Sequence, residues 1–166
     1  IPDLPIKVED LRVYEWRAGA ATLAREFLRW GPCQRSVGFA SGTPDSVWAW
    51  LARQGIREVA FADAGGVHIW CCTFTADQQG SEVSAALAGI MGNPPVAVLA
   101  DFPRDSQYRA FVTRLGAGGF WARSQFNLST ACGNPMARPR VLVLAYRRSA
   151  LKVAPTVEHG DPNLLR

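Results

Sequence analysis

The chain has 166 residues, of which 48% are hydrophobic, and its net charge is +4. This length and apolar fraction are enough to bury the core of one ordinary domain. No apolar run is long enough to cross a bilayer as a helix, so we expect no membrane span. The positive charge is compatible with nucleic acid but too small to predict it.

The cysteines favour a reducing compartment. None has the spacing of a metal site, and adjacent cysteines rarely bridge each other. We therefore expect an intracellular protein without a bound metal. The first residue is not methionine, and a processed targeting peptide is one explanation that would suggest a plastid or mitochondrion, with the nucleus as the alternative. The four cysteines are Cys33, Cys71, Cys72 and Cys132.

Hydrophobic periodicity predicts alternating strands and helices along the first half of the chain. Proline interrupts the first ten residues, which we interpret as a leader lying on the domain. Glycine, proline and N-cap signals then separate the elements. We expect strands at Leu11–Trp16, Val37–Ser41, Glu58–Asp63 and Val67–Cys72, and helices at Ala20–Trp30 and from Thr43 (N-cap) and Pro44 to Gly55.

The second half continues the alternation and ends in a polar tail, residues 149–166, that follows a domain spanning 11–148. We expect a three-layer α/β sandwich with a mostly parallel sheet and helices on both faces. Its remaining elements are a helix at Ser81–Met91 with Val83, Leu87, Ile90 and Met91 inward, a strand at Val96–Leu99, a helix at Ser106–Leu115, and strands at Phe120–Leu128 and Val141–Tyr146. The strands 96–99 and 141–146 should lie near the centre of the sheet.

Two arginines stand in a proline-rich loop just before the last strand, Gly133–Arg140. At positions i and i+2 of an extended segment they point the same way and can address one anion or one base. This loop resembles the eighth conserved motif of DNA (cytosine-5) methyltransferases, Gly-x-Pro-Gln-x-Arg-x-Arg. Arg138 and Arg140 occupy the arginine positions, and the resemblance makes them catalytic-site residues if the chain is active. The alternative is a basic surface loop on any α/β domain.

The turn after the first strand resembles the family's first motif, Asp-Leu-Phe-Ala-Gly-x-Gly-Gly, which holds S-adenosylmethionine. Glu15, Ala18 and Gly19 fit this motif and are the candidate cofactor-binding residues. Asp63, at the end of the third expected strand, is a fourth candidate. The later glycines of the motif, which allow the backbone to approach the methyl donor closely, are replaced by alanine and threonine. Gly42 stands where the second motif has the acid that binds the ribose.

The segment Trp70–Thr75 falls where the family has its catalytic Pro-Cys-Gln-x-Phe-Ser loop. Cys71 takes the place of the nucleophile, and the resemblance implies that its thiolate would attack C6 of a flipped cytosine. The alternative is a small buried residue at a strand end, as free cysteines commonly are. The family's glutamate that bonds cytosine N3 is Ala100 here. Asp101 comes one residue later and, by strand alternation, on the other side.

The resemblance covers residues 11–148 as six altered motifs in the family's order, and it implies a Rossmann-like methyltransferase fold. Because the altered positions carry the chemistry, we expect a catalytically inactive methyltransferase-like domain. It would act as a structural or interaction subunit with protein partners, and no cofactor is expected. The alternative is a divergent or split cytosine-5 methyltransferase that uses S-adenosylmethionine and acts on DNA or RNA through Cys71.

Three further expectations concern large side chains. Trp16, Arg17 and Trp70 should fill the crevice at the carboxyl ends of the strands. Arg138 and Arg140 should form ion pairs or bonds to carbonyl groups that hold their loop, or contact an acidic partner. Surface tryptophans would suit docking onto partners; the candidates are Trp16, Trp30, Trp48, Trp50, Trp70 and Trp121.

Overall fold

The computed structural model describes residues 7–18, 23–24, 33–39, 43–75, 80–104, 107–128 and 139–150. Most of the expected leader, most of the first expected helix, the loop containing Arg138, and nearly all of the expected tail lie outside these residues.

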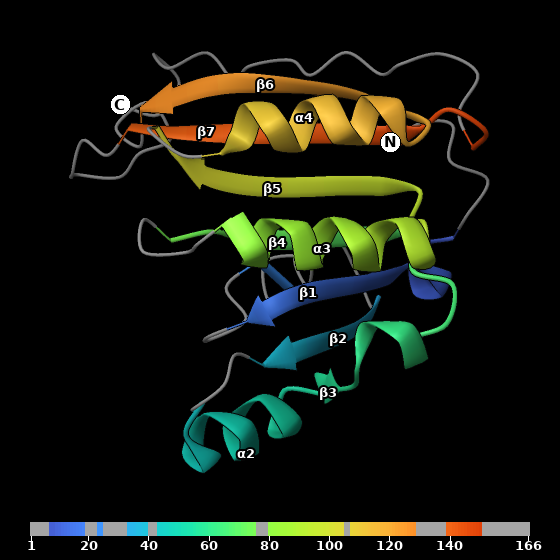
Figure 1. Ribbon diagram of the computed structural model, residues 1–166. Coiled ribbons are helices and arrows are strands. Elements are labelled where there is room, and N and C mark those ends of the chain that lie inside the picture. Colours follow the sequence, from blue (N-terminus) through green and yellow to red (C-terminus); the bar gives the residue numbers. More distant parts are fainter. Residues whose placement is uncertain are drawn as a thin grey trace, which may run out of the picture.

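A seven-stranded sheet forms the middle layer, in the order β3-β2-β1-β4-β5-β7-β6 (Figure 1). Of these described strands β7 alone runs opposite to the other six, so the predicted mostly parallel sheet is confirmed. The predicted strand 141–146 falls within β7, and the predicted strand 96–99 overlaps β5, which begins at Ala97 and continues to Pro103. Both have neighbours on both sides, as expected. The bounds are β1 Arg12–Ala18, β2 Gln34–Phe39, β3 Arg57–Glu58, β4 Ile69–Thr73, β5 Ala97–Pro103, β6 Phe120–Leu128 and β7 Pro139–Arg147.

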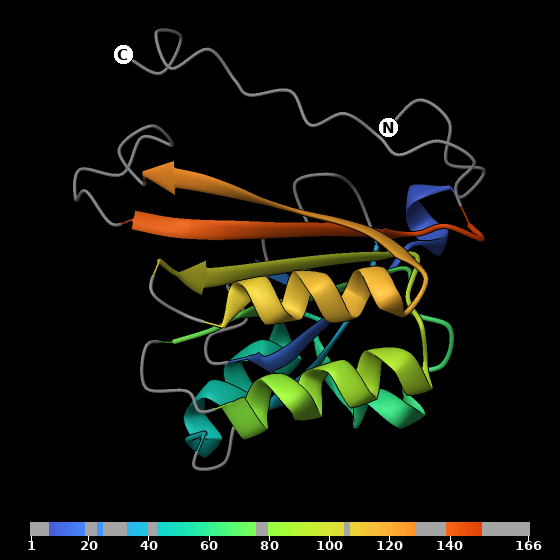
Figure 2. The ribbon, with the colours of Figure 1, turned by 45° about the horizontal axis from the view of Figure 1, so that its top comes forward.

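Helices cover both faces of this sheet, which confirms the predicted three layers. The helices α3 (Gly80–Gly92) and α4 (Tyr108–Ala117) lie side by side over one face (Figures 1 and 2). The helix α2 (Asp45–Arg53) covers the other face, where its Leu51 joins Val37 of β2 in a buried cluster. Two short 3-10 helices, η1 (Val8–Asp10) and η3 (Phe61–Asp63), complete the described elements.

The larger core lies between the sheet and the pair α3 and α4, and it is rich in aromatic rings. Alternate residues of β4 and β5 point into it, as the period of two along a strand requires. Phe74 and Phe102 stack with their centroids 4.3 Å apart, and Trp70 stacks on Phe111 at 6.4 Å. Burial of such rings supplies much of the apolar area that stabilises a domain.

The predicted strand at 58–63 is wrong beyond its first residue. Strand β3 has only two residues. Its one described neighbour is β2, and the two strands pair at only two positions, Ser36 and Val37 of β2. The chain then turns, and Phe61 enters the core beside Tyr14 with a ring distance of 4.9 Å. An apolar run therefore indicated burial correctly, but it did not distinguish a strand from a 3-10 turn.

Two expectations about helices are also corrected. Helix α2 begins at Asp45, with Pro44 at the capping position and no side-chain cap bond, one residue later than predicted. Met91 is 37% exposed instead of buried. The buried stripe of α3 is Val83, Ala86, Leu87 and Ile90, at i, i+3, i+4 and i+7, and Met91 falls on the rim of that stripe.

Candidate functional site

The strand order reverses between β1 and β4, since the chain runs outward from β1 through β2 to β3 and then returns to β4. In open α/β sheets, ligands bind outside the carboxyl ends of the strands at such a switch point. The candidate site is therefore the switch-point crevice beside the carboxyl ends of β1 and β4.

A β-bulge at the end of β1 directs Arg17 across this crevice. The pairing of β1 with β2 shifts between Glu15 and Ala18, and Arg17 has a φ of 48°, which is rare for a residue with a side chain. Its guanidinium lies over the Trp16 ring, 4.7 Å from the ring centroid. Strained backbone of this kind is often found at functional positions.

Arg17 forms an ion pair with Glu82, a residue of the first turn of α3. The distance from Arg17 Nη1 to Glu82 Oε1 is 2.8 Å, and the side chains are 37% and 27% exposed. The second carboxylate oxygen, Oε2, is buried and has no hydrogen-bond partner among the residues that the structure describes. The sequence analysis missed Glu82, whose signal was an acidic residue in the first turn of the helix after β4, where the helix dipole favours negative charge.

The three large side chains expected in the crevice separate into two groups. Arg17 crosses it, and Trp16 lies half-buried beneath the guanidinium. Trp70 is fully buried in the main core, so its placement in the crevice was wrong. Its ring centroid lies 6.1 Å from that of Trp16, so Trp16 packs directly against this core.

Of the predicted cofactor-binding residues, Glu15 and Ala18 lie together at the end of β1. Glu15 is buried, and its Oε2 accepts a hydrogen bond of 2.9 Å from the backbone N–H of Ala24. Gly19 lies outside the described residues. Asp63 is exposed in η3, which follows β3, two strands away from β1 in the sheet. The cofactor role of these residues stays a prediction.

Cys71 lies inside β4, paired with Glu15 of β1 and with Leu99 of β5. Its side chain is completely buried, and its Sγ donates to the carbonyl oxygen of Tyr14 at 3.4 Å. Burial raises the pKa of this thiol well above its usual value, and the nearby Glu15 carboxylate raises it further. A neutral thiol in the interior of a sheet is a poor nucleophile.

Arg140 holds together three segments at the carboxyl end of the sheet. Its Nε bonds Asp101 Oδ1 at 3.0 Å, and its Nη2 bonds the carbonyl oxygens of Phe74 at 2.9 Å and of Asp101 at 3.2 Å. The ion pair and carbonyl contacts expected of this arginine are therefore present. Ala100 points into the core and Asp101 to the other face, as strand alternation predicted. Arg138 lies outside the described residues.

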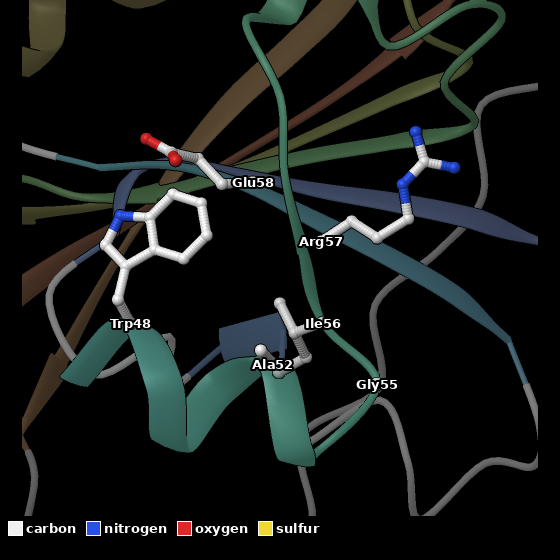
Figure 3. A pocket seen from close by; sticks show the side chains of 6 residues that line it. All are labelled: Trp48, Ala52, Gly55, Ile56, Arg57 and Glu58. Carbon is white, nitrogen blue, oxygen red and sulfur yellow. The ribbon is translucent and has the colours of Figure 1, made fainter. Parts of the chain in front are cut away.

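A separate pocket of about 330 Å³ lies at the β3 edge of the sheet (Figure 3). The Trp48 ring on α2 faces Glu58, while the Arg57 side chain points away from Glu58 and Trp48. Ligand sites combine apolar walls with a few convergent polar groups, and the charged groups here diverge. The pocket is lined by Trp48, Ala52, Gly55, Ile56, Arg57 and Glu58.

His68 lies directly before β4, and its lowered pKa leads us to predict that the stability of the domain depends on pH. Its Nδ1 accepts a bond of 2.9 Å from the backbone N–H of Arg12. Burial and then the Arg12 charge lower its pKa below the usual 6.5, although Asp10 opposes this. Because the pKa of His68 is lower in the folded chain than in the unfolded chain, the unfolded chain binds a proton at His68 first as pH falls below about 6.5, and this stabilises the unfolded state. We expect the melting temperature to decrease from pH 7.5 to 5.5.

The matched variant for this prediction is His68→Asn, which keeps an acceptor near Nδ1 but does not titrate. Its melting temperature should change less over the same pH range, as followed by circular dichroism. Equal pH dependence in both proteins would mean that His68 is not responsible.

Within the described part of the chain, no group of three or more histidine, cysteine, aspartate or glutamate side chains could hold a metal. Among the same residues, no helix is long and apolar enough to cross a membrane.

Comparisons with known proteins agree with the fold. No protein-family model matches the chain, and no curated protein matches it in sequence. Solved structures do match it. Magnesium protoporphyrin IX methyltransferase from Synechocystis, solved with bound S-adenosylmethionine, has 14% identity and a TM-score of 0.64, over 84% of this chain and 71% of that one.

Two other similar structures are also named as methyltransferases. A putative prophage DNA modification methyltransferase (E. coli) has 12% identity, a TM-score of 0.67 and covers 89% of this chain. The S. pombe Dnmt2 methyltransferase has 16% identity, a TM-score of 0.60 and covers 82%. This chain spans 49% of the length of each. At these identities the likeness concerns the fold: the chain has the Rossmann-like fold of S-adenosylmethionine-dependent methyltransferases.

Proposed function

We propose that this chain is a methyltransferase-like domain that does not transfer methyl groups itself and acts as a structural or interaction subunit of a larger assembly. The observation that carries the proposal is the position of Cys71. Its thiol lies within a strand that is paired on both sides, it is completely buried, and it bonds to a backbone carbonyl.

Attack on a base requires a thiolate that a flipped nucleotide can reach. Strand β4 continues for two residues beyond Cys71, to Thr73, so this cysteine is not on a loop beyond the strand end. Bringing a base to Sγ would require opening the pairing of β4 with β1 or β5. The raised pKa of the thiol adds to that cost.

The acid needed to activate the base is also absent from its expected position. Ala100 is fully buried in the core, and the carboxylate of Asp101 is already bonded by Arg140. A general acid must be free to reach the proton-accepting atom of its substrate. Ala100 is thus used for packing, and its neighbour Asp101 is used for an ion pair.

A role in docking agrees with part of the tryptophan distribution. Trp48 is 40% exposed, whereas Trp70 is fully buried, which corrects the expectation that all six tryptophans could face partners. Trp16, Trp50 and Trp121 are half-buried, and Trp30 lies outside the described residues. Exposed tryptophan is enriched at protein interfaces.

The alternative function is methyl transfer by a divergent or split cytosine-5 methyltransferase that acts on DNA or RNA through Cys71. The similarity to the prophage and Dnmt2 structures favours this second candidate. It requires β4 to rearrange, or a partner chain to supply the missing groups.

Transfer of labelled methyl groups to DNA and RNA tests the proposal. The chain is assayed alone and with its copurifying proteins, beside Cys71→Ser as the matched variant. We expect no transfer above background by either protein, since the Cys71 thiol is buried and neutral, Ala100 carries no acid, and Asp101 is bonded by Arg140. Transfer by the unmodified chain that disappears in Cys71→Ser would establish the alternative and remove our proposal.

A further inference from the structure

We infer that two copies of this chain pair through strand β6, so that their two sheets join into one continuous sheet about a two-fold axis. Strand β6 forms one edge of the sheet, and β7 is its one neighbour among the described strands (Figure 1). The inference goes beyond the proposed function, because it names a second copy as a partner and holds whether or not the chain transfers methyl groups.

Strand β6 lacks the usual protection of an edge strand. An exposed row of backbone N–H and C=O groups pairs readily with another chain, so natural edges are commonly short or carry a bulge, a proline or a lysine. Strand β6 has nine residues without proline or lysine, and its register with β7 is unbroken. The opposite edge of the described sheet, β3, has only two residues.

The backbone groups of β6 that face the free edge follow from the pairing of β7. The backbone N–H of Arg147 donates at 2.8 Å to the carbonyl oxygen of Val96, on the β5 side, so Tyr146 faces β6. Its partner in the register is Trp121. Trp121 and every second residue after it therefore direct their N–H and C=O groups to β7. The residues between them direct these groups to the free edge: Ala122, Ser124 and Phe126.

An antiparallel pairing of two β6 strands centred on Ser124 uses these backbone groups and suits the side chains. It overlaps all nine residues, and Ser124 faces Ser124 of the copy, as a two-fold contact requires. Arg123 then lies opposite Gln125 instead of a second arginine, so no like charges meet directly. Ala122, the smallest residue of the strand, lies opposite Phe126.

This register also places the exposed half of one β6 beside the covered half of the other. Phe120 is buried, and the half-buried Ala122 packs against the same core, which α4 covers. Ser124 and Phe126 lie on the same face of the strand but are exposed. Phe126 is 51% exposed, although the Arg104 guanidinium lies over its ring at 5.5 Å. Pairing would bring each Phe126 to the edge of the core of the other copy, and exposed aromatic residues are enriched at interfaces.

Sedimentation equilibrium of the full chain tests the inference. The monomer has a mass of 18.1 kDa. We expect twice this mass at about 100 μM protein, where a pair with a micromolar dissociation constant is mostly dimeric. Ser124→Lys should give the monomer mass, because two ammonium groups would face each other across the two-fold axis. Ser124→Pro should do the same, because it removes an N–H that faces the free edge and leaves the bonds to β7 in place.

A mixture of opposite charges provides the most specific measurement. Ser124→Glu alone should be monomeric, but an equal mixture of Ser124→Lys and Ser124→Glu should recover the dimer mass, since each carboxylate then faces an ammonium. Glu58→Lys is the matched control, because it adds the same side chain to the opposite edge strand, and it should remain dimeric. Circular dichroism should show that all variants fold.

Three results would overturn the inference. They are a monomer mass for the unmodified chain, a dimer that Ser124→Lys and Ser124→Pro leave intact, and a mixture of the two charged variants that stays monomeric. Cys71-dependent methyl transfer would remove the proposed function but leave this pairing standing.

Discussion

Replacing Trp70 with alanine is expected to lower the free energy of unfolding by about 3–5 kcal/mol, the usual cost of truncating a large buried aromatic side chain. Trp70 is completely buried, stacks on Phe111 and supports Trp16 beneath the crevice. The neighbouring backbone belongs to the central strand β4, which can collapse little onto the space left behind. Equilibrium denaturation in urea measures the change.

Two variants make this experiment specific. Trp48→Ala removes the same side chain from an exposed position on α2 and should cost less than about 1 kcal/mol. Trp70→Phe should cost much less than Trp70→Ala, because it keeps a ring and also removes an indole N–H that has no hydrogen-bond partner in the described part of the chain. Similar losses for Trp70→Ala and Trp48→Ala would contradict the structure of this core.

Replacing Arg140 with methionine is expected to lower the free energy of unfolding by about 1–3 kcal/mol. The change removes one ion pair and two bonds to carbonyl oxygens, all in a partly buried position. Methionine keeps much of the apolar stem, so that the loss reports the polar contacts. Asp101→Asn should cost less, because it keeps an acceptor opposite Arg140 Nε. The changes are measured by denaturant unfolding.

Arg123→Met provides the comparison for Arg140. Arg123 is exposed on the neighbouring strand β6, and its replacement should change stability by less than about 0.5 kcal/mol. If both replacements cost the same, Arg140 does not hold the segment after β4. Methyl transfer that depends on Arg140 would point instead to the catalytic role implied by the methyltransferase resemblance.

The periodicity of the sequence was sufficient for the fold class. Each strand was found near its predicted place except at 58–63, where an apolar run of strand length forms a strand of only two residues and a 3-10 turn. That difference depends on the neighbouring strand β2, which offers pairing at only two positions there. Strand content depends on pairing partners, and pairing partners are not a property of the local sequence.

The site was only partly predictable. The sequence placed Cys71 in the order of the methyltransferase motifs, but a motif does not state whether its residue lies on a loop or within a strand. It placed Arg17 near the crevice, yet it had no means to find Glu82, which is 65 residues away and resembles any acidic residue at the start of a helix.

By itself, the sequence determined the alternation of strands and helices and the absence of an acid at Ala100, because these depend on residue type and short-range spacing. Only the tertiary structure decided that Cys71 is buried against Tyr14, that Arg140 bonds Asp101 and that Arg17 meets Glu82. These partners are 57, 39 and 65 residues apart in the chain. Sheet pairing and helix packing bring them within hydrogen-bond distance, and the burial and charge that result set what each group can do.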